Sequence, residues 1–301
     1  MVEKKFWNQL NHNLINMKNC ATVIAMLMVL LASCSKENNA KSNKDYLVTI
    51  STTYGDMKVI LFDETPLHKA NFLKLAQDHE YDSTIWHRVI EGFMIQGGGI
   101  DIKSGSNETR KLIDAEILPN HIHRKGALAA ARTGDHINPE KKSSWCQFYI
   151  VQGEVYDSAQ LKSFEEQTNQ SKKGRLFNEI IRRPENAHIL GAGQEYQREN
   201  NQEKLDSLMN HVMEMVDREL VPLEYSNLQV EAYTTIGGTP HLDKEYTVFG
   251  QVIDGMDVID RIAGVEKGSG DKPKVDLFLT MEVEQLSKKK ITKLYGYEYP
   301  E

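Results

Sequence analysis

A positively charged side chain, Arg88, and an amide, Gln96, lie close together in the sequence among large apolar residues. Two β-prone runs, 85–90 and 93–96, carry them and are joined by a tight turn. Because side chains alternate along a strand, we expect Arg88 to share a face with Trp86. The pattern predicts one fixed hydrogen-bond donor beside apolar groups. Such a site suits an apolar residue whose backbone accepts from that donor.

Other residues suggest different chemistry, but their spacing does not support it. His121 and His123 would point the same way on a strand, yet no third ligand is apparent nearby, so no metal site is expected. Cys146 could be a thiol nucleophile, but without a supporting motif a buried structural cysteine is the favoured interpretation. The hydrolase motif Gly-x-Ser-x-Gly is missing from the sequence. The glycines at 97–99 predict close approach of a ligand backbone.

The stretch 87–98, HRVIEGFMIQGG, resembles the core motif of the cyclophilins, which are peptidyl-prolyl cis-trans isomerases. The resemblance extends over about residues 46–153 and 236–286. It rests on the first hairpin and helix (53–77), the strand KGALAAAR (125–132), the strand SSWCQFYIV (143–151) and the run GGTPHLDKEYTVFGQV (237–252). It implies a mainly β fold, a closed eight-stranded antiparallel barrel capped by two helices, which this chain would interrupt with a large helical insertion.

The resemblance also implies roles for individual residues. Arg88 and Gln96 are expected to be catalytic, with the arginine acting on the prolyl nitrogen. The substrate groove would be formed by Phe93, Met94, Ala131, Gln147, Tyr149, Leu242 and Tyr246. The proline ring would lie against Phe93, Met94, Tyr149 and Leu242. The flanking peptide would be held by Gln96, Gln147 and the backbone near Ala131.

Several positions depart from the family pattern. Arg132 replaces the usual Asn and adds a charge at the groove wall. Tyr149 replaces the Phe that is usual at the pocket floor, so its hydroxyl must find a partner if it is buried. His241 stands where many eukaryotic members carry Trp, and Tyr246 where they carry His. Glu116 matches an acidic residue with a structural rather than a catalytic role.

Residue patterns predict the elements that position this groove. Strands are expected at 46–52 and 57–62, joined by the turn Tyr54-Gly55-Asp56. A helix is expected from Pro66 to about His79, with Thr65 as its N-cap. The predicted domain, 46–286, then ends with a helix at 255–263 and a strand at 275–286, followed by a C-terminal tail at 287–301.

Residues 154–235 interrupt the family pattern and are expected to be helical. Apolar residues recur there at helical spacing, at Leu205, Leu208, Met209, Val212, Met215, Val216 and Leu220. The insertion holds most of the chain's net charge of −7. Two interpretations stay open: a helical appendage packed on the barrel, or an arm that docks a partner or client.

The N-terminal region predicts export and lipid anchoring. The apolar run 21–32 is too short to span a bilayer, which needs about 20 apolar residues. It is typical of a signal peptide, 1–33, with Met17 as an alternative start. The sequence LASC resembles the lipobox of bacterial lipoproteins, so Cys34 would be acylated and would begin a tether, 34–45. A retained apolar anchor is the alternative.

Together these features predict a peptidyl-prolyl isomerase that rotates X-Pro bonds in exported polypeptides and assists their folding. Its expected partners are proline-containing, unfolded or partly folded envelope proteins and the lipid bilayer of the bacterial cell envelope, and no cofactor is expected. The alternative is a non-catalytic holdase or assembly scaffold that binds proline-containing segments. The negative net charge argues against nucleic-acid binding.

Overall fold

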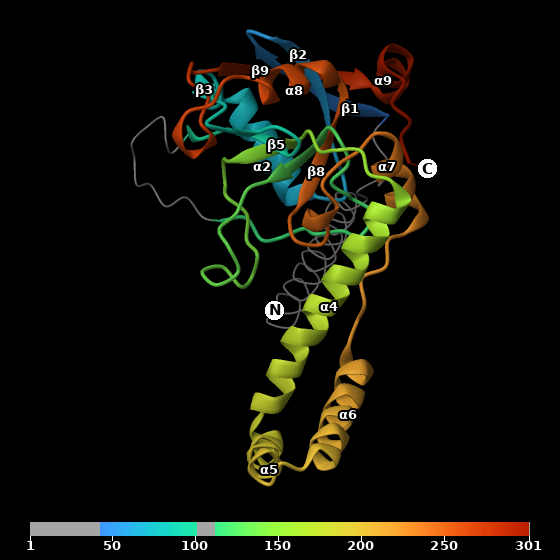
Figure 1. The fold of residues 1–301 in the computed structure, drawn as a ribbon. Coiled ribbons are helices and arrows are strands. Elements are labelled where there is room, and N and C mark those ends of the chain that lie inside the picture. Colours follow the sequence, from blue (N-terminus) through green and yellow to red (C-terminus); the bar gives the residue numbers. More distant parts are fainter. Residues whose placement is uncertain (1–42, 101–111, 301) are drawn as a thin grey trace, which may run out of the picture. The chain divides into compact units, whose positions relative to one another are not determined.

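An antiparallel sheet of nine strands carries the core of the structure, a computed structural model that describes residues 43–100 and 112–300. The strands are hydrogen-bonded in the order β3-β9-β1-β2-β8-β6-β7-β5-β4 (Figure 1). They are Lys44–Thr52 (β1), Gly55–Leu61 (β2), Thr84–Ile85 (β3), Arg88–Ile90 (β4), Met94–Gly97 (β5), Ala127–Ala130 (β6), Phe148–Val151 (β7), Val248–Asp254 (β8) and Phe278–Ser287 (β9). The predicted signal peptide, Cys34 and most of the tether lie outside the described residues.

The mainly β, antiparallel character is confirmed, but the predicted closed ring of eight strands was wrong. The sheet's two ends, β3 and β4, follow each other along the chain, separated only by Trp86 and His87. The backbone of Trp86 bonds to Leu277, next to β9, whereas that of His87 bonds to Gln96 of β5. The strand predicted at 85–90 is thus divided, and its two parts pair with different neighbours. This interruption raises the strand count and leaves the sheet open.

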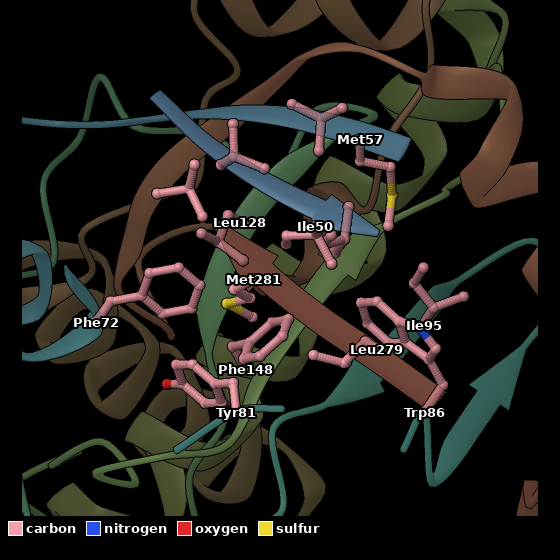
Figure 2. Packing of buried hydrophobic residues seen from close by; sticks show 14 of the residues in the cluster. Ile50, Met57, Phe72, Tyr81, Trp86, Ile95, Leu128, Phe148, Leu279 and Met281 are labelled. Atoms are coloured by element: carbon pink, nitrogen blue, oxygen red, sulfur yellow. The ribbon is translucent and has the colours of Figure 1, made fainter. Parts of the chain in front are cut away.

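The middle strands of the sheet are buried on both faces. Along β7, Phe148 and Ile150 belong to the main core, whereas Tyr149 and Val151 belong to a second apolar cluster. The neighbouring strand β6 alternates in the same way. Figure 2 shows the main core, where the rings of Phe72, Tyr81, Phe148 and Trp86 gather beside aliphatic side chains of the strands. The second cluster, on the other face, forms the base of the site described below.

Helix α2 (Pro66–Gln77) and helix α8 (Met256–Ala263) both add apolar residues to the main core. Pro66 begins α2 as predicted, but Thr65 makes no side-chain cap bond. Glu116 takes over this function, because its carboxylate accepts from the backbone N–H groups of Leu67 and His68, each at 3.0 Å. The expectation of a structural role for Glu116 agrees with these bonds. An anion at a helix N-terminus is also favoured by the helix dipole.

The segment between β7 and β8 is helical, as predicted. It contains α4 (Ser158–Arg182), α5 (Ala187–Arg198), α6 (Gln202–Glu219) and α7 (Asn227–Thr235), with a short 3-10 turn, η1 (Pro184–Asn186). Helices α4, α5 and α6 share a small core of their own around Ile180, Ile189, Val212 and Val216. Of the predicted apolar series on α6, Val212 and Val216 are buried, whereas Met209 is 47% exposed. The series therefore packs within the insertion only in part.

The C-terminal segment expected to be a tail contains helix α9 (Lys288–Tyr295). Ser287 caps it by accepting from the backbone N–H of Lys290 at 3.2 Å. Ile291 is fully buried against Leu47 and Ile60 of the first hairpin. The helix therefore packs against the sheet. None of the described helices is both long and apolar enough to cross a bilayer.

Candidate active site

Arg88 is the first residue of β4, just after the chain changes its strand partner at Trp86 and His87. Arg88 pairs with Gln96 of β5, and the backbone N–H of His87 also donates to the Gln96 carbonyl at 3.0 Å. The backbone of Trp86 bonds instead to Leu277, so Trp86 and Arg88 do not belong to one continuous strand. Trp86 is fully buried in the main core, while Arg88 is exposed beside the second cluster. The predicted shared face of Trp86 and Arg88 was wrong for this reason.

The turn between β4 and β5 fixes the ring of Phe93. The backbone N–H of Gly92 donates to the Gln152 side chain at 2.8 Å. The Phe93 carbonyl accepts from the backbone N–H groups of Gln152 and Gly153, each at 3.0 Å. The Phe93 ring stacks on His241, with ring centroids 5.5 Å apart. A short turn with these bonds holds a large apolar ring in one place.

Two amides are joined beside Arg88. The side chain of Gln96 donates to that of Gln147 at 3.2 Å, so the two predicted peptide-binding amides lie together. The backbone N–H of Ala131 donates to the Gln147 carbonyl at 3.0 Å, and the Ala131 carbonyl accepts from the N–H of Ser144 at 2.8 Å. The peptide-binding role expected of the Ala131 backbone is therefore limited to the second lone pair of its carbonyl.

Tyr149 lies on the sheet below these residues and is 5% exposed. The prediction that its hydroxyl would need a partner if buried is confirmed, because it lies 2.9 Å from Nε2 of His123. Burial raises the pKa of the Tyr149 phenol well above its ordinary value. The phenol is therefore a neutral hydrogen-bonding group and not a nucleophile.

Arg132 and Tyr246 form one wall of the site. The Arg132 guanidinium lies 4.4 Å from the centroid of the Tyr246 ring. It donates to the backbone carbonyl of Glu245 at 2.9 Å and forms a 2.5 Å ion pair with Asp135. Its side chain is only 4% exposed. The charge predicted for the groove wall is thus present, but it is already compensated.

These residues surround a hollow of about 100 Å³. Its lining consists of Arg88, Phe93, Met94, Gln96, Ala131, Arg132, Tyr149, Leu242 and Tyr246. Leu242 reaches it from a 3-10 turn, η2 (Pro240–Leu242). All but one of the residues predicted from the sequence line this hollow, and the exception, Gln147, is reached through its bond to Gln96.

Arg88 is the more exposed of the two arginines in the lining. Its Nε atom lies 3.7 Å from a carboxylate oxygen of Asp271, in the 3-10 turn η3 (Ser269–Asp271), and both side chains are about half exposed, at 44% and 49%. An exposed ion pair of this length contributes little, about 0–1 kcal/mol. The guanidinium can therefore donate to a ligand in the hollow. Asp271 had no signal in the sequence, because its proximity arises only from the fold.

The glycines after β5 do not serve the role that the sequence suggested. A side chain on Gly97 would meet the Trp86 ring at 3.0 Å, and one on Gly98 would meet the Cys146 carbonyl at 2.5 Å. Gly98 also has a φ of +76°. The expectation that they admit a ligand backbone was therefore wrong for Gly97 and Gly98, because the protein's own core fills that space. Cys146 is buried, as the structural interpretation predicted.

The two histidines considered as metal ligands face different partners. His121 stacks on Phe62, with ring centroids 4.3 Å apart, whereas His123 bonds to Tyr149 and Asp243. Within residues 43–100 and 112–300, no group of three or more His, Cys, Asp or Glu side chains is arranged to hold a metal. Sequence reasoning missed the role of His123 at the site, although the unpartnered hydroxyl of Tyr149 was the signal that could have led to it.

The described lining contains no Ser, Cys, Asp, Glu or Lys side chain. It combines a guanidinium and an amide pair with an apolar base, which suits a ligand with a compact apolar ring and backbone acceptors. Such a site can favour one conformation of a bound peptide over another without making or breaking a covalent bond.

A family model described as "Cyclophilin type peptidyl-prolyl cis-trans isomerase/CLD" matches residues 47–183 and 167–283. A candidate bifunctional phosphatase/peptidyl-prolyl cis-trans isomerase of Streptococcus pyogenes is 32% identical over 243 residues, covering 78% of this chain and 38% of that protein. The match thus spans well under half of that relative. A candidate peptidyl-prolyl cis-trans isomerase of Staphylococcus aureus is 26% identical over 259 residues, covering 85% of this chain and 100% of the relative.

Solved structures are also similar to the chain. A crystal structure of a Cryptosporidium parvum cyclophilin type peptidyl-prolyl cis-trans isomerase, in the presence of the dipeptide Ala-Pro, is 20% identical and has a TM-score of 0.46. The match covers 79% of this chain and 98% of that one. A cyclophilin from Hirschia baltica is 16% identical with a TM-score of 0.42, covering 82% of this chain and 79% of that one.

Proposed function

Because the chain belongs to the cyclophilin-type peptidyl-prolyl cis-trans isomerases, we propose that the hollow beside Arg88 binds proline and is the site of rotation about the X-Pro bond. The observation that carries this assignment is the position of Arg88 over an apolar hollow with an exposed, weakly paired guanidinium. This side chain is available to a ligand, and its surroundings fit a proline ring.

The reaction needs a group that stabilises a twisted amide. The X-Pro bond rotates over a barrier of about 20 kcal/mol, because amide resonance is lost on the way. Twisting localises a lone pair on the prolyl nitrogen, which then becomes a better hydrogen-bond acceptor. A donor aimed at that nitrogen stabilises the twisted state more than the planar one, which is the condition for catalysis. Arg88 is suited to donate, since an arginine side chain stays charged throughout the physiological pH range.

The other residues of the hollow hold the substrate around this donor. Met94 and Tyr149 form the apolar base for the proline ring, and Phe93 and Leu242 enclose it. Gln96 and Gln147, already joined to each other, orient the flanking peptide. Gln96 is also the strand partner of Arg88, so the two residues start from neighbouring backbone positions.

Replacing Arg88 by alanine tests the assignment. We expect Arg88→Ala to lower kcat/KM on a proline tetrapeptide by roughly 100-fold, which corresponds to about 3 kcal/mol for a charged donor. The measurement is a protease-coupled assay, in which the protease cleaves only the trans isomer. Arg198→Ala, on the exposed end of α5, is the matched control and should retain full activity. Equal rates for the two variants would remove Arg88 from the mechanism.

We further propose that the substrates are exported polypeptides and that the enzyme is attached to the bacterial cell envelope by a lipid on Cys34. The support is the apolar run 21–32 followed by LASC. Mass spectrometry of the mature N-terminus checks this proposal. An acylated Cys34 is the expected result, and a chain that still begins at Met1 or Met17 contradicts it.

The alternative function, a holdase or scaffold, draws support from the insertion. Phe164, Leu190 and Met209 on its helices are large apolar residues that are 41%, 47% and 47% exposed. Such residues could bind unfolded segments. A holdase suppresses aggregation of a client without turnover. If this is the function, Arg88→Ala protects a client from aggregation as well as the wild type does. The wild type then also shows no catalysis in the peptide assay.

A further inference from the structure

A buried chain of hydrogen bonds runs from the base of the hollow to the inserted helices. The Tyr149 hydroxyl lies 2.9 Å from Nε2 of His123, and Nδ1 of His123 lies 3.0 Å from Oδ1 of Asp243. The other carboxylate oxygen of Asp243 accepts from Gln229 at 2.7 Å and from the Tyr233 hydroxyl at 2.6 Å. Gln229 and Tyr233 both belong to α7. The side chain of His123 is 0% exposed and that of Asp243 5%.

The state of the Asp243 carboxylate determines which atoms donate and which accept along this series of hydrogen bonds. Burial alone would raise the pKa of Asp243, but the hydrogen bonds from His123, Tyr233 and Gln229 hold the pKa below its ordinary value. The carboxylate is therefore an acceptor, and His123 donates to it from Nδ1. We infer the neutral ring for His123, in which Nε2 is left as an acceptor. Tyr149 then donates to Nε2. The Tyr149 hydroxyl is thus held by His123 and the ring lines the hollow.

Helix α7 packs against the segment that carries His123. Ile122 shares an apolar cluster with Tyr233 and with Leu161 of α4. Gly238 lies between the His123 backbone and the Tyr233 ring. A side chain at this position would come within 2.3 Å of the His123 carbonyl and 2.6 Å of the Tyr233 ring. The backbone N–H of Thr239 donates to the same carbonyl at 2.8 Å. The segment that carries His123 is therefore held between Tyr149 of the hollow and α7.

We propose that His123 is a positioning residue of the proline pocket and that α7, through Tyr233, Gln229 and Asp243, completes this pocket. The proposal rests on the proposed function, in which Tyr149 forms the base for the proline ring. Its consequence is that part of the insertion belongs to the substrate site. Loss of a bond at the α7 end should weaken peptide binding, while turnover of bound peptide persists because Arg88 is unchanged.

A double-mutant cycle on the full chain tests this coupling. We measure the dissociation constant of an Ala-Pro tetrapeptide for the wild type, Tyr149→Phe, Tyr233→Phe and the double variant. Each single change should weaken binding roughly threefold to tenfold, as expected for one hydrogen bond, and the double variant should be no weaker than Tyr149→Phe alone. Tyr156→Phe is the control, because Tyr156 lies in the same cluster as Tyr233 but is not among the groups that donate to Asp243. It should bind like the wild type.

The histidine tautomer gives a readout that general loosening of the fold would not produce. In ¹⁵N spectra of the wild type, His123 should be protonated at Nδ1 and carry a hydrogen-bonded, unprotonated Nε2. In Asp243→Asn the side-chain amide can donate to Nδ1, so the proton should move to Nε2. Additive effects in the cycle, a Tyr233→Phe variant that binds like Tyr156→Phe, or a wild-type His123 protonated at Nε2 would each overturn the proposal. A wild type that catalyses no isomerisation would instead contradict the proposed function.

Discussion

At the scale of single residues, the two arginines of the hollow differ in how far they are already engaged. Arg132 is buried, bonded to the backbone of Glu245, paired with Asp135 and stacked on Tyr246. Arg88 is half exposed and lies 3.7 Å from Asp271. A donor must form a stronger bond in the twisted state than in the ground state, so a guanidinium already engaged within the protein contributes less. We therefore propose that Arg132 shapes the site and that Arg88 acts on the substrate.

Asp243 makes the stability of the fold depend on pH in one direction. Its folded pKa lies below the ordinary value of 3.8, because the hydrogen bonds that it accepts outweigh the effect of burial. Its contribution is therefore fully present above pH 3.8 and is lost as the pH falls toward the folded pKa. We expect the difference in unfolding free energy between the wild type and Asp243→Asn to be constant from about pH 7 to about pH 5 and to shrink below about pH 4.

Urea unfolding of both proteins across this pH range measures the difference. Other carboxylates titrate in both proteins and cancel in the comparison. A difference that stays the same at about pH 3 would show that the Asp243 carboxylate is not stabilised by these bonds.

Which residues meet at the site was largely visible in the sequence, because its motifs resemble those of the cyclophilins and that resemblance implies the groove residues. The apolar residues of the groove and the amide of Gln96 all line the hollow. The face on which Arg88 lies was not predictable from alternation, since the chain changes its strand partner between Trp86 and Arg88. The partner of Tyr149 could be anticipated as a need, but its identity, His123, depends on a contact between distant segments.

At the scale of elements, the N-terminus of α2 was predicted from local sequence, but the residue that caps it was not. Thr65 precedes Pro66, which is a strong local signal for a helix start, and the helix begins at Pro66. The cap itself comes from Glu116, far away in the sequence. Local pattern therefore predicted the element, whereas the groups that complete it came from tertiary structure.

Removal of this distant cap should destabilise the fold. Glu116→Ala leaves two backbone N–H groups of α2 without their acceptor and removes the bond to the His68 ring. We expect a loss of about 1–2 kcal/mol in the free energy of unfolding, measured with urea. Glu282→Ala, at an exposed position of β9, is the control and should cost less than about 0.5 kcal/mol. Equal losses for both variants would argue against the capping role.

At the scale of the whole molecule, the insertion has two parts with different surroundings. Its last helix, α7, and the start of α4 share a cluster with Ile122 of the β domain, whereas α4, α5 and α6 pack on one another around Ile180 and Val216. The helical periodicity of the segment predicted its secondary structure. It could not separate these two parts, because the contacts of α7 depend on Asp243 and Gly238, which lie after the insertion.

The second part should be removable without loss of peptide turnover. Asn169 and Leu223 are joined by two hydrogen bonds, of 2.9 and 2.6 Å, so the chain can be shortened there. A short Gly-Ser linker in place of residues 171–221 retains α7 and the start of α4. We expect kcat/KM on a proline peptide to stay within about twofold of the wild type. A folded variant that lost more than about tenfold would show that the outer helices also serve the reaction.

The central claim is that Arg88 accelerates rotation of a bound X-Pro bond without being needed for binding. The most direct measurement is exchange NMR on an Ala-Pro peptide, which reports the rate of cis-trans exchange and the dissociation constant in one sample. For Arg88→Ala we predict a loss of roughly 100-fold in the exchange rate of bound peptide, with affinity changed by less than about fivefold. Exchange at the wild-type rate in this variant would contradict the account.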